Sequence, residues 1–268
     1  MPLPPPTHAP TPVAVESVAP GNVPATDAEK DSSTVGCLER LLPSLWPSGS
    51  CSQRSPLGIR LVLISDTHGC HRKLTIPDGD VLIHAGDFTR MGLEEDATDF
   101  NVWLGELPHP HKLCVNGNHE CNAAWKGEAY SMLSNATFLR DESVTIRVAK
   151  PDGVTIVPLR VHGTEFCWPM RSRNPAYEAI AVGSSDTPID VLVAHSPVKG
   201  YVDGGKGCAE LLRLAERLRP RAVIGGHIHH AHDVQQGQGR LSEITFINAA
   251  NARSAHTDMG WPPVVLDI

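Results

Sequence analysis

Short runs of branched apolar residues alternate with longer amphipathic stretches from residue 58 onwards, and this pattern predicts an α/β fold. The run at 59–65 is too short for a buried helix, and its composition favours a strand covered on both faces. Comparable runs follow at 81–84, 112–115, 191–194, 222–224, 244–248 and 264–266. Residues 144–148 and 154–161 instead alternate between apolar and polar side chains, which predicts antiparallel strands.

Helical spacing of apolar residues predicts helices between these strands. The helix expected at 93–107 ends before Pro108 and has one apolar face, made of Leu93, Ala97, Phe100, Leu104 and Leu107. A second helix is expected at 123–133. A third, at 208–218, ends before Pro220 and should turn inward Leu211, Leu212, Ala215 and Leu218. Residues 164–187 show no period, and we expect a loop with a short helix there.

The first 57 residues differ from the rest, because they are rich in Pro, Ala, Thr and Val and show no strand period. This composition predicts a disordered extension with polyproline II character. A Pro-x-x-P ligand at 2–6 lacks a flanking basic residue, so a solvated tail is the simpler interpretation. Apolar residues at 35–45 have helical spacing and predict at most one short docked helix. We therefore expect an extension at 1–57 and one domain at 58–268.

Charge and cysteine content narrow the classes of partner and compartment. The 268-residue chain carries a formal net charge of −7, which argues against duplex nucleic acid or an anionic membrane as the main partner. We find no signal peptide and no apolar run long enough to span a bilayer. The 7 cysteines are an odd number without a Cys-x-x-Cys pair, which favours reduced thiols in a cytoplasmic protein.

Metal-binding residue types follow five of the predicted strands. They are Asp66 and His68, Asp87, Asn118 and His119, His195, and His227 and His229. Because strands of an open α/β sheet gather their ligands at their carboxyl ends, these loops should converge. Carboxylate and amide oxygens mixed with imidazoles suit Mn, Fe or Zn. Gly86, Gly117 and Gly226 each precede a predicted ligand, where a tight turn or close approach needs no side chain.

Taken in order, these motifs resemble the calcineurin-like metallophosphoesterase superfamily. They read DTH at 66–68, GD at 86–87, GNHE at 117–120, His195, and GHIH at 226–229. The resemblance covers about residues 59–268. The segments FNVWLGELP, GCAELL, TFINAAN and PPVVLDI are further similar to metallophosphoesterase-domain proteins related to class III cyclic-nucleotide phosphodiesterases.

The resemblance implies a four-layer αββα sandwich with two mixed β-sheets, and a centre of two divalent ions. One ion would be held by Asp66, His68, Asp87 and His229, and the other by Asp87, Asn118, His195 and His227. Asp87 would bridge the pair, and a hydroxide shared by the ions would attack phosphorus. His119 would protonate the leaving alkoxide and, with Asn118, contact substrate. Glu120 either supports this group by orienting His119 or is a surface carboxylate.

The function expected from the resemblance is hydrolysis of a small phosphodiester, with a cyclic nucleotide first in line. A phosphomonoesterase or protein phosphatase on the same site is the alternative enzyme, and a weakly active nucleotide-binding sensor or scaffold is the alternative of another class. We expect Mn first among the metals, a small phosphoester as substrate, and no membrane partner. The oligomeric state does not follow from the sequence.

Other residues near the motifs have plainer interpretations. His84 is expected to be a hydrogen-bonded core histidine rather than a support for a ligand. His230 and His232 either touch substrate or are solvated. Cys70 and Cys121 flank ligand loops, and we expect them only to pack.

Overall fold

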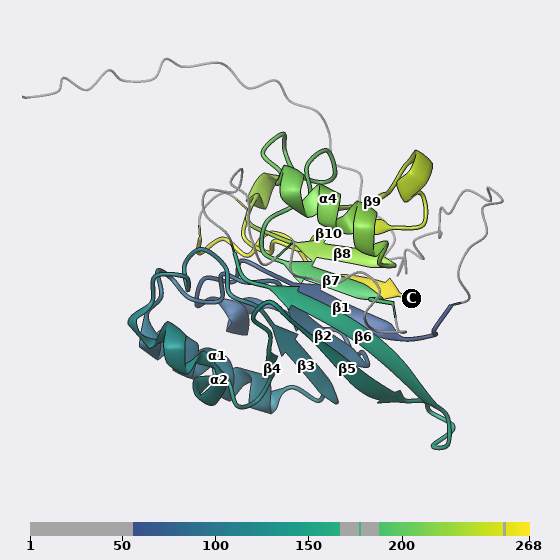
Figure 1. Ribbon diagram of the computed structural model, residues 1–268. Coiled ribbons are helices and arrows are strands. Elements are labelled where there is room, and N and C mark those ends of the chain that lie inside the picture. The colour runs from purple at the N-terminus through teal and green to yellow at the C-terminus, as the bar shows by residue number, and fades with distance from the viewer. Residues whose placement is uncertain (1–55, 167–176, 178–187, 254–255) are drawn as a thin grey trace, which may run out of the picture. The chain divides into compact units, whose positions relative to one another are not determined.

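The computed structural model describes residues 56–166, 177, 188–253 and 256–268 (Figure 1). The predicted extension at 1–57 therefore lies outside the described residues up to residue 55, together with the short helix expected at 35–45. Most of the loop predicted at 164–187 also lies outside them.

One mixed sheet has the order β11-β1-β2-β3-β4. Strands β1 (Arg60–Ile64), β2 (Val81–His84), β3 (His111–Cys114) and the two-residue β4 (Thr137–Phe138) run parallel. Strand β11 (Val264–Asp267) pairs antiparallel with β1. The apolar runs of β1 and β2 are buried at nearly every position, as expected for strands covered on both faces.

The second mixed sheet has the order β5-β6-β7-β8-β10-β9. Strands β6 (Ile156–Thr164), β7 (Val191–Ala194), β8 (Ala222–Gly225) and β10 (Thr245–Asn248) form its parallel centre. The edge strands β5 (Glu142–Ala149) and β9 (Asp233–Gln236) pair antiparallel with β6 and β10. The antiparallel pair predicted from alternation is therefore confirmed as β5 and β6.

Helices cover the outer face of each sheet (Figure 1). Helix α1 (Glu94–Glu106), the 3-10 helix η2 (Ala124–Glu128) and α2 (Ala129–Met132) pack on the first sheet through a cluster that includes Phe88 and Phe100. Helix α4 (Ala209–Leu218) packs on the second through Leu211 and Leu214. A third cluster, with Leu63 and Val193, fills the space between the sheets. The expected four-layer sandwich with two mixed sheets is confirmed.

Two local predictions need correction, and two strands have no counterpart among the predicted strands. The helix expected at 123–133 begins as a 3-10 helix and becomes α-helical only at Ala129–Met132. On α4, Leu214 rather than Leu212 lies fully in the core beside Leu211 and Ala215. Strands β4 and β9 were not predicted, because one has only two residues and the other, DVQQ, is mostly polar. Short 3-10 turns also occur at His71–Lys73, His229–Ala231 and Gly239–Leu241.

The two sheets are joined at the carboxyl end of β1. Ser65 forms an isolated parallel bridge with Ala250, just beyond β10. The Asn251 backbone N–H donates to the Ser65 carbonyl at 2.9 Å, and the Ser65 N–H donates to Asn251 Oδ1 at 3.2 Å. This junction brings the loops that follow β1 and β10 together at one edge, next to the loops that follow β2, β3, β7 and β8.

Candidate metal centre

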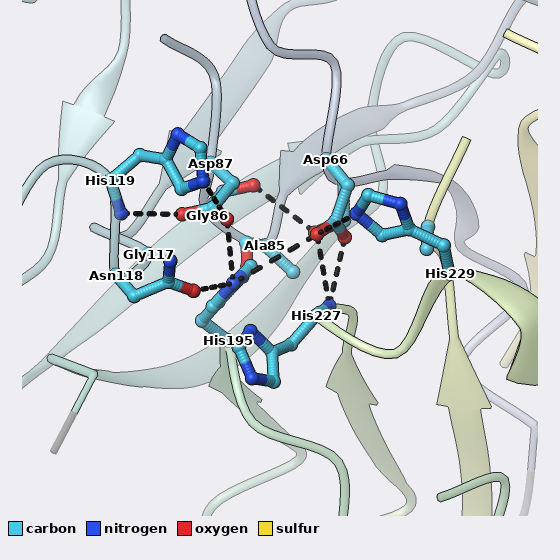
Figure 2. A network of polar contacts seen from close by, with 12 residues as sticks. Asp66, Ala85, Gly86, Asp87, Gly117, Asn118, His119, His195, His227 and His229 are labelled. Atoms are coloured by element: carbon cyan, nitrogen blue, oxygen red, sulfur yellow. Dashed lines mark hydrogen bonds and ion pairs between the residues drawn. The ribbon is translucent and has the colours of Figure 1, made fainter. Parts of the chain in front are cut away.

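Seven predicted ligands meet at this edge. Figure 2 shows Asp66, Asp87, Asn118, His195, His227 and His229. One group, Asp66, His68 and His229, has one potential ligand atom per residue, all within 4.8 Å of one another, and Asp87, His195 and His227 form a second such group. Asn118 lies with the second group, since its Oδ1 is 3.1 Å from His195 Nε2. The loops after β1, β2, β3, β7 and β8 contribute these side chains, so the expected convergence is confirmed.

The first group has the spacing of side chains that face one ion. His68 Nε2 and His229 Nε2 are 3.2 Å apart, and His229 Nε2 is 3.3 Å from Asp66 Oδ1. This separation lets a single cation contact both nitrogens at ordinary metal–nitrogen distances of about 2.0–2.1 Å. Asp66 and His68 are fully buried, so their orientation is fixed by packing.

The second group adjoins the first through His195. Its Nε2 is 3.2 Å from Asp87 Oδ2 and 3.9 Å from Asp66 Oδ1. Its Nδ1 lies 2.8 Å from the Ala85 carbonyl, which can only accept a hydrogen bond. The proton of neutral His195 therefore sits on Nδ1, and Nε2 keeps a free lone pair toward the carboxylates. A carbonyl holding the second ring nitrogen is the usual support of a metal-binding histidine.

The backbone is strained at four of the predicted ligands. Asp66, His68, Asp87 and His227 have φ values of 55°, 44°, 57° and 67°, in the left-handed region that side chains other than glycine rarely adopt. Such conformations cost about 1–3 kcal/mol each and collect at functional sites. Neighbouring contacts stabilise these strained conformations. At His227, for example, the backbone N–H donates to Asp66 Oδ2 at 2.9 Å.

Two of the motif glycines are required by close contacts. A Cβ at Gly117 would lie 2.1 Å from Asp87 Oδ1, and a Cβ at Gly226 would lie 2.1 Å from Ser65 Oγ and 2.3 Å from Asp66 Oδ2. No side chain fits at either position without moving a carboxylate. The sequence-based reason given for these glycines is therefore confirmed.

The electrostatics of the centre suit cations. Burial alone would lower the pKa of His195, but the Asp87 and Asp66 carboxylates together raise it to about 9. Burial also disfavours the charged form of Asp66 and would raise its pKa. The imidazoles of His195, His229 and His68 nevertheless bring the pKa of Asp66 below its ordinary value. The two buried carboxylates thus stabilise the protonated, positively charged form of the His195 imidazole. The donor set and this field fit divalent ions, which would supply that charge directly.

Glu120 supports the Asp87 loop from behind. Its buried carboxylate accepts hydrogen bonds from the backbone N–H groups of Asp87, Thr89 and Gly117, each at 2.9 Å, and from Thr89 Oγ1 at 2.6 Å. Burial and the nearby Asp87 carboxylate raise its pKa to about 7, against the effect of the Thr89 and Gly117 donors. Glu120 is therefore not a surface carboxylate, and its hydrogen bonds go to the Asp87 and Gly117 loops rather than to the His119 ring.

His119 lies beside the two groups rather than in either. Its backbone N–H donates to Asp87 Oδ1 at 2.9 Å, and its Nε2 is 3.7 Å from Asp87 Oδ2. Its Nδ1 is buried and has no hydrogen-bond partner among the described residues. The ring centroid is 4.6 Å from that of His68. His119 thus faces the centre with an imidazole that no described residue engages on Nδ1.

Sequence reasoning missed one histidine of the centre. His256 comes from the loop after β10, and His68, His119 and His256 form a third group with ligand atoms within 4.8 Å.

His84 is a hydrogen-bonded core histidine, as expected, with Nε2 2.9 Å from Thr67 Oγ1 and Nδ1 accepting from the Gly86 N–H at 3.2 Å. It lies between two of the ligand loops.

Neighbouring histidines and cysteines lie outside the metal-binding groups. His232 stacks on Trp261 and contacts the Ala250 carbonyl at 2.9 Å, while His230 is exposed. Cys70 and Cys121 are free thiols and join none of the three groups found among the described residues. Packing remains the interpretation for both cysteines.

The fold and the donor set together define the class of two-sheet α/β metal proteins with adjoining Asp/His sites. A comparison with family models matches residues 59–231 to the calcineurin-like phosphoesterase family. The chain belongs to this family, whose members typically bind two divalent metals, and membership supports a phosphoric ester hydrolase.

No helix in the described ranges is long and apolar enough to cross a bilayer.

Two proteins are similar to this chain in sequence, and one solved structure is similar to it in fold. UPF0046 protein K07C11.7 of Caenorhabditis elegans is 39% identical over 74% of this chain and 71% of its own length. Metallophosphoesterase domain-containing protein 1 of Homo sapiens is 32% identical over 78% of this chain and 71% of its own length. The solved structure of TT1561 of Thermus thermophilus matches with a TM-score of 0.51 and 14% identity, over 71% of this chain and 88% of that chain, which shows a shared fold.

Proposed function

We propose that the protein is a dinuclear metal-dependent phosphodiesterase that hydrolyses small phosphodiesters, with cyclic nucleotides as the first candidates. The observation that carries the proposal is the meeting of the Asp66 and Asp87 groups around one buried imidazole, that of His195. Family membership and the similarity to a metallophosphoesterase-domain protein support ester hydrolysis.

In this proposal Asp66, His68 and His229 hold one ion, and Asn118, His195 and His227 hold the other. Asp87 lies against His195 and supplies a carboxylate to both. When bound, the two ions would polarise the phosphoryl group and lower the pKa of a water that serves as nucleophile. Mn is the metal we favour, and Fe and Zn accept the same donors.

The residues of the chain itself carry the remaining chemistry. His119 is the general acid of the proposal, because its Nε2 faces Asp87 at 3.7 Å while its ring lies outside both metal-binding groups. An imidazole there can donate a proton to the departing alkoxide of an ester. Asn118 joins His119 in contacting the substrate, since it follows Gly117 at the same strand end. The Ala85 carbonyl keeps His195 in the tautomer that leaves Nε2 available.

The charges around the centre favour a diester over a monoester. Among the described residues, the hydrogen bonds and ion pairs to the seven predicted ligands come from histidines, carboxylates, an amide and the main chain, with no arginine or lysine. A phosphodiester carries one negative charge and a monoester about two near pH 7. We take the lack of an arginine or lysine contact among these described residues as support for the singly charged ester.

We also infer that residues 58–268 carry the activity and that the cytoplasm is the location. Cys114 is a buried free thiol, which suits a reducing compartment. A chain lacking residues 1–57 should keep the metal affinity and activity of the full chain. Loss of folding in that shorter chain would show that the extension belongs to the domain.

The test is turnover by metal-stripped protein reloaded with Mn. Substrates are bis-(p-nitrophenyl) phosphate, p-nitrophenyl phosphate and a panel of cyclic nucleotides, with Asp66→Asn as the control for contaminating enzymes. Preferential hydrolysis of the diester and of at least one cyclic nucleotide supports the proposal. Turnover of the monoester alone would instead indicate a phosphomonoesterase or protein phosphatase, and tight nucleotide binding without turnover would indicate a sensor.

A further inference from the structure

His256 lies over the centre although it belongs to none of the motifs. Its ring stacks on that of His68, with centroids 4.1 Å apart and an interplanar angle of 21°. It meets the His119 ring edge-on at 5.1 Å and the His229 ring at 5.7 Å. The family model matches residues 59–231, so this histidine lies outside the matched range.

The loop that carries His256 is fastened on both sides of it. At its base the Trp261 N–H donates to the Asn251 carbonyl, and Asn251 Nδ2 donates to the Trp261 carbonyl, each at 3.1 Å. The Arg253 N–H donates to the Asp258 carbonyl at 2.8 Å. Beside the histidine, Lys73 Nζ donates to the Thr257 carbonyl at 3.1 Å. Described residues on both sides of His256 are therefore fixed by hydrogen bonds, and His256 itself is exposed.

The loop is also tied to the segment that carries Asp66 and His68. Asn251 exchanges hydrogen bonds with Ser65, the residue directly before Asp66. The side chains of His68 and Asp66 are buried, whereas His256 is exposed. His256 thus stands on the solvent side of the centre, where a substrate arrives.

The nitrogens of His119 and His256 are placed to share one oxygen. One ring nitrogen from each of His68, His119 and His256 lies within 4.8 Å of the others. With hydrogen bonds of about 2.8–3.0 Å, one oxygen can contact two nitrogens that are this far apart. Neither ring nitrogen of His119 has a hydrogen bond among the described residues: its Nδ1 is buried without a partner, and its Nε2 lies 3.7 Å from Asp87 Oδ2.

A third ion in the His68, His119 and His256 group is the weaker interpretation. His68 Nδ1 faces the Thr89 carbonyl at 3.4 Å, and its Nε2 faces His229 Nε2 at 3.2 Å. The one nitrogen that His68 can offer is therefore committed to the Asp66 group. A third ion would rest on two imidazoles, with no carboxylate in the group to balance its charge.

We propose that His256 is a substrate-binding residue that donates a hydrogen bond to a phosphoryl oxygen of a phosphate ester bound against His119. The proposal rests on the proposed function for the identity of the ester. It does not require turnover, because inorganic phosphate, the simplest ligand with such oxygens, should bind the same position. The His256 ring borders the substrate position on the side of His68, on which it stacks.

The experiment measures inorganic phosphate binding to the Mn-loaded full chain by calorimetry, with Mn content determined in parallel. His256→Ala should weaken phosphate binding about tenfold or more, as expected for a lost hydrogen bond to a charged group, and leave the Mn content unchanged. His256→Gln, which keeps an N–H donor, should recover part of the affinity. His111→Ala removes a histidine at the amino end of β3, away from the loops at the carboxyl ends of the strands, and should bind phosphate like the unmodified chain.

Equal phosphate affinity in His256→Ala and the unmodified chain would overturn the assignment, as would an unmodified chain that binds no phosphate. A lower Mn content in His256→Ala would also overturn it, and would make His256 a metal ligand. The proposed function fails separately. If the Mn-loaded chain hydrolyses no ester while His256→Ala still weakens phosphate binding, the contact stands and the phosphodiesterase proposal does not.

Discussion

The Asp87 backbone N–H donates to Glu120 Oε2 at 2.9 Å, which ties the loop after β2 to the turn after β3. The same carboxylate accepts the Gly117 N–H, so Glu120 sets the distance between the Asp87 and Asn118 loops. Asp87 itself has a φ of 57°, and this strained conformation needs such a partner. The position of the central carboxylate thus depends on a buried acid that faces away from the centre.

Glu120→Gln should destabilise the protein and weaken metal binding, because the amide NH2 would meet backbone N–H groups that now have an acceptor. We expect a loss of about 2–4 kcal/mol in the free energy of unfolding, measured by urea titration of the metal-free chain. Glu128→Gln, at an exposed position, is the control and should change it by less than about 0.5 kcal/mol. A stability of Glu120→Gln equal to that of the control would remove Glu120 from this supporting role.

Gly226→Ala tests the close approach at the first group. Its Cβ would fall 2.1 Å from Ser65 Oγ and 2.3 Å from Asp66 Oδ2, so the Asp66 carboxylate must move. We expect the Mn affinity to fall at least about tenfold, the loss that altered support of a ligand typically causes. Gly127→Ala is the matched control, since its Cβ meets nothing within 4 Å. Unchanged Mn affinity in Gly226→Ala would show that the carboxylate is not needed where it lies.

His119→Ala tests the general acid. Loss of such a group costs about 10²–10⁴ in rate when the leaving group is a poor one. An alkoxide leaving group, as in a cyclic nucleotide, needs the proton, whereas a nitrophenolate leaves with little help. The variant should therefore lose far more rate on the cyclic nucleotide than on bis-(p-nitrophenyl) phosphate. Equal losses on the two substrates, in parallel kcat measurements, would exclude this role.

His162 gives the fold a dependence on acid that is separate from the centre. Burial lowers its pKa to about 4, and the unfolded chain should have the ordinary value near 6.5. Between these two pKa values only the unfolded state takes up the proton. The contribution of His162 to the free energy of unfolding is therefore fully present above about pH 6.5 and is lost as the pH falls toward 4. We expect a contribution of roughly 2–3 kcal/mol to this fall.

His162→Gln keeps a partner for Ser143 Oγ, which now lies 2.9 Å from His162 Nδ1, and it does not titrate. Its free energy of unfolding, measured by urea titration between pH 7 and pH 4.5, should fall less steeply than that of the unmodified chain. Parallel pH dependences of the two chains would show that His162 is not the group responsible.

The parts of the fold that follow from sequence are those that packing determines locally. The runs that became β1, β2, β7 and β8 are buried on both faces, so their apolar composition identifies them without tertiary information. Strand β9 escapes such reasoning, because its DVQQ segment is held by pairing with β10 rather than by an apolar face. The helix at 124–132 begins as a 3-10 helix, in which Trp125 is buried near Phe88, and the apolar spacing of the sequence does not distinguish this from an α-helical start.

The same distinction applies to the centre. Each motif residue stands directly after a recognisable strand, so the topology alone predicts where it lies. His256 follows β10 at a distance, in a loop closed by main-chain hydrogen bonds at Asn251 and Arg253, and no local signal marks it. The hydrogen bonds of Glu120 were also beyond sequence reasoning, because the acceptor role of its carboxylate depends on where two separate loops place their N–H groups.

The central claim is that the two groups hold a pair of ions with Asp87 between them. A crystal structure of the Mn-loaded protein, with anomalous scattering recorded for Mn, tests it directly. We predict two anomalous peaks, one contacting Asp66, His68 and His229 and the other contacting Asn118, His195 and His227, with both contacting Asp87. A single peak, or peaks that leave Asp87 out, would contradict the account.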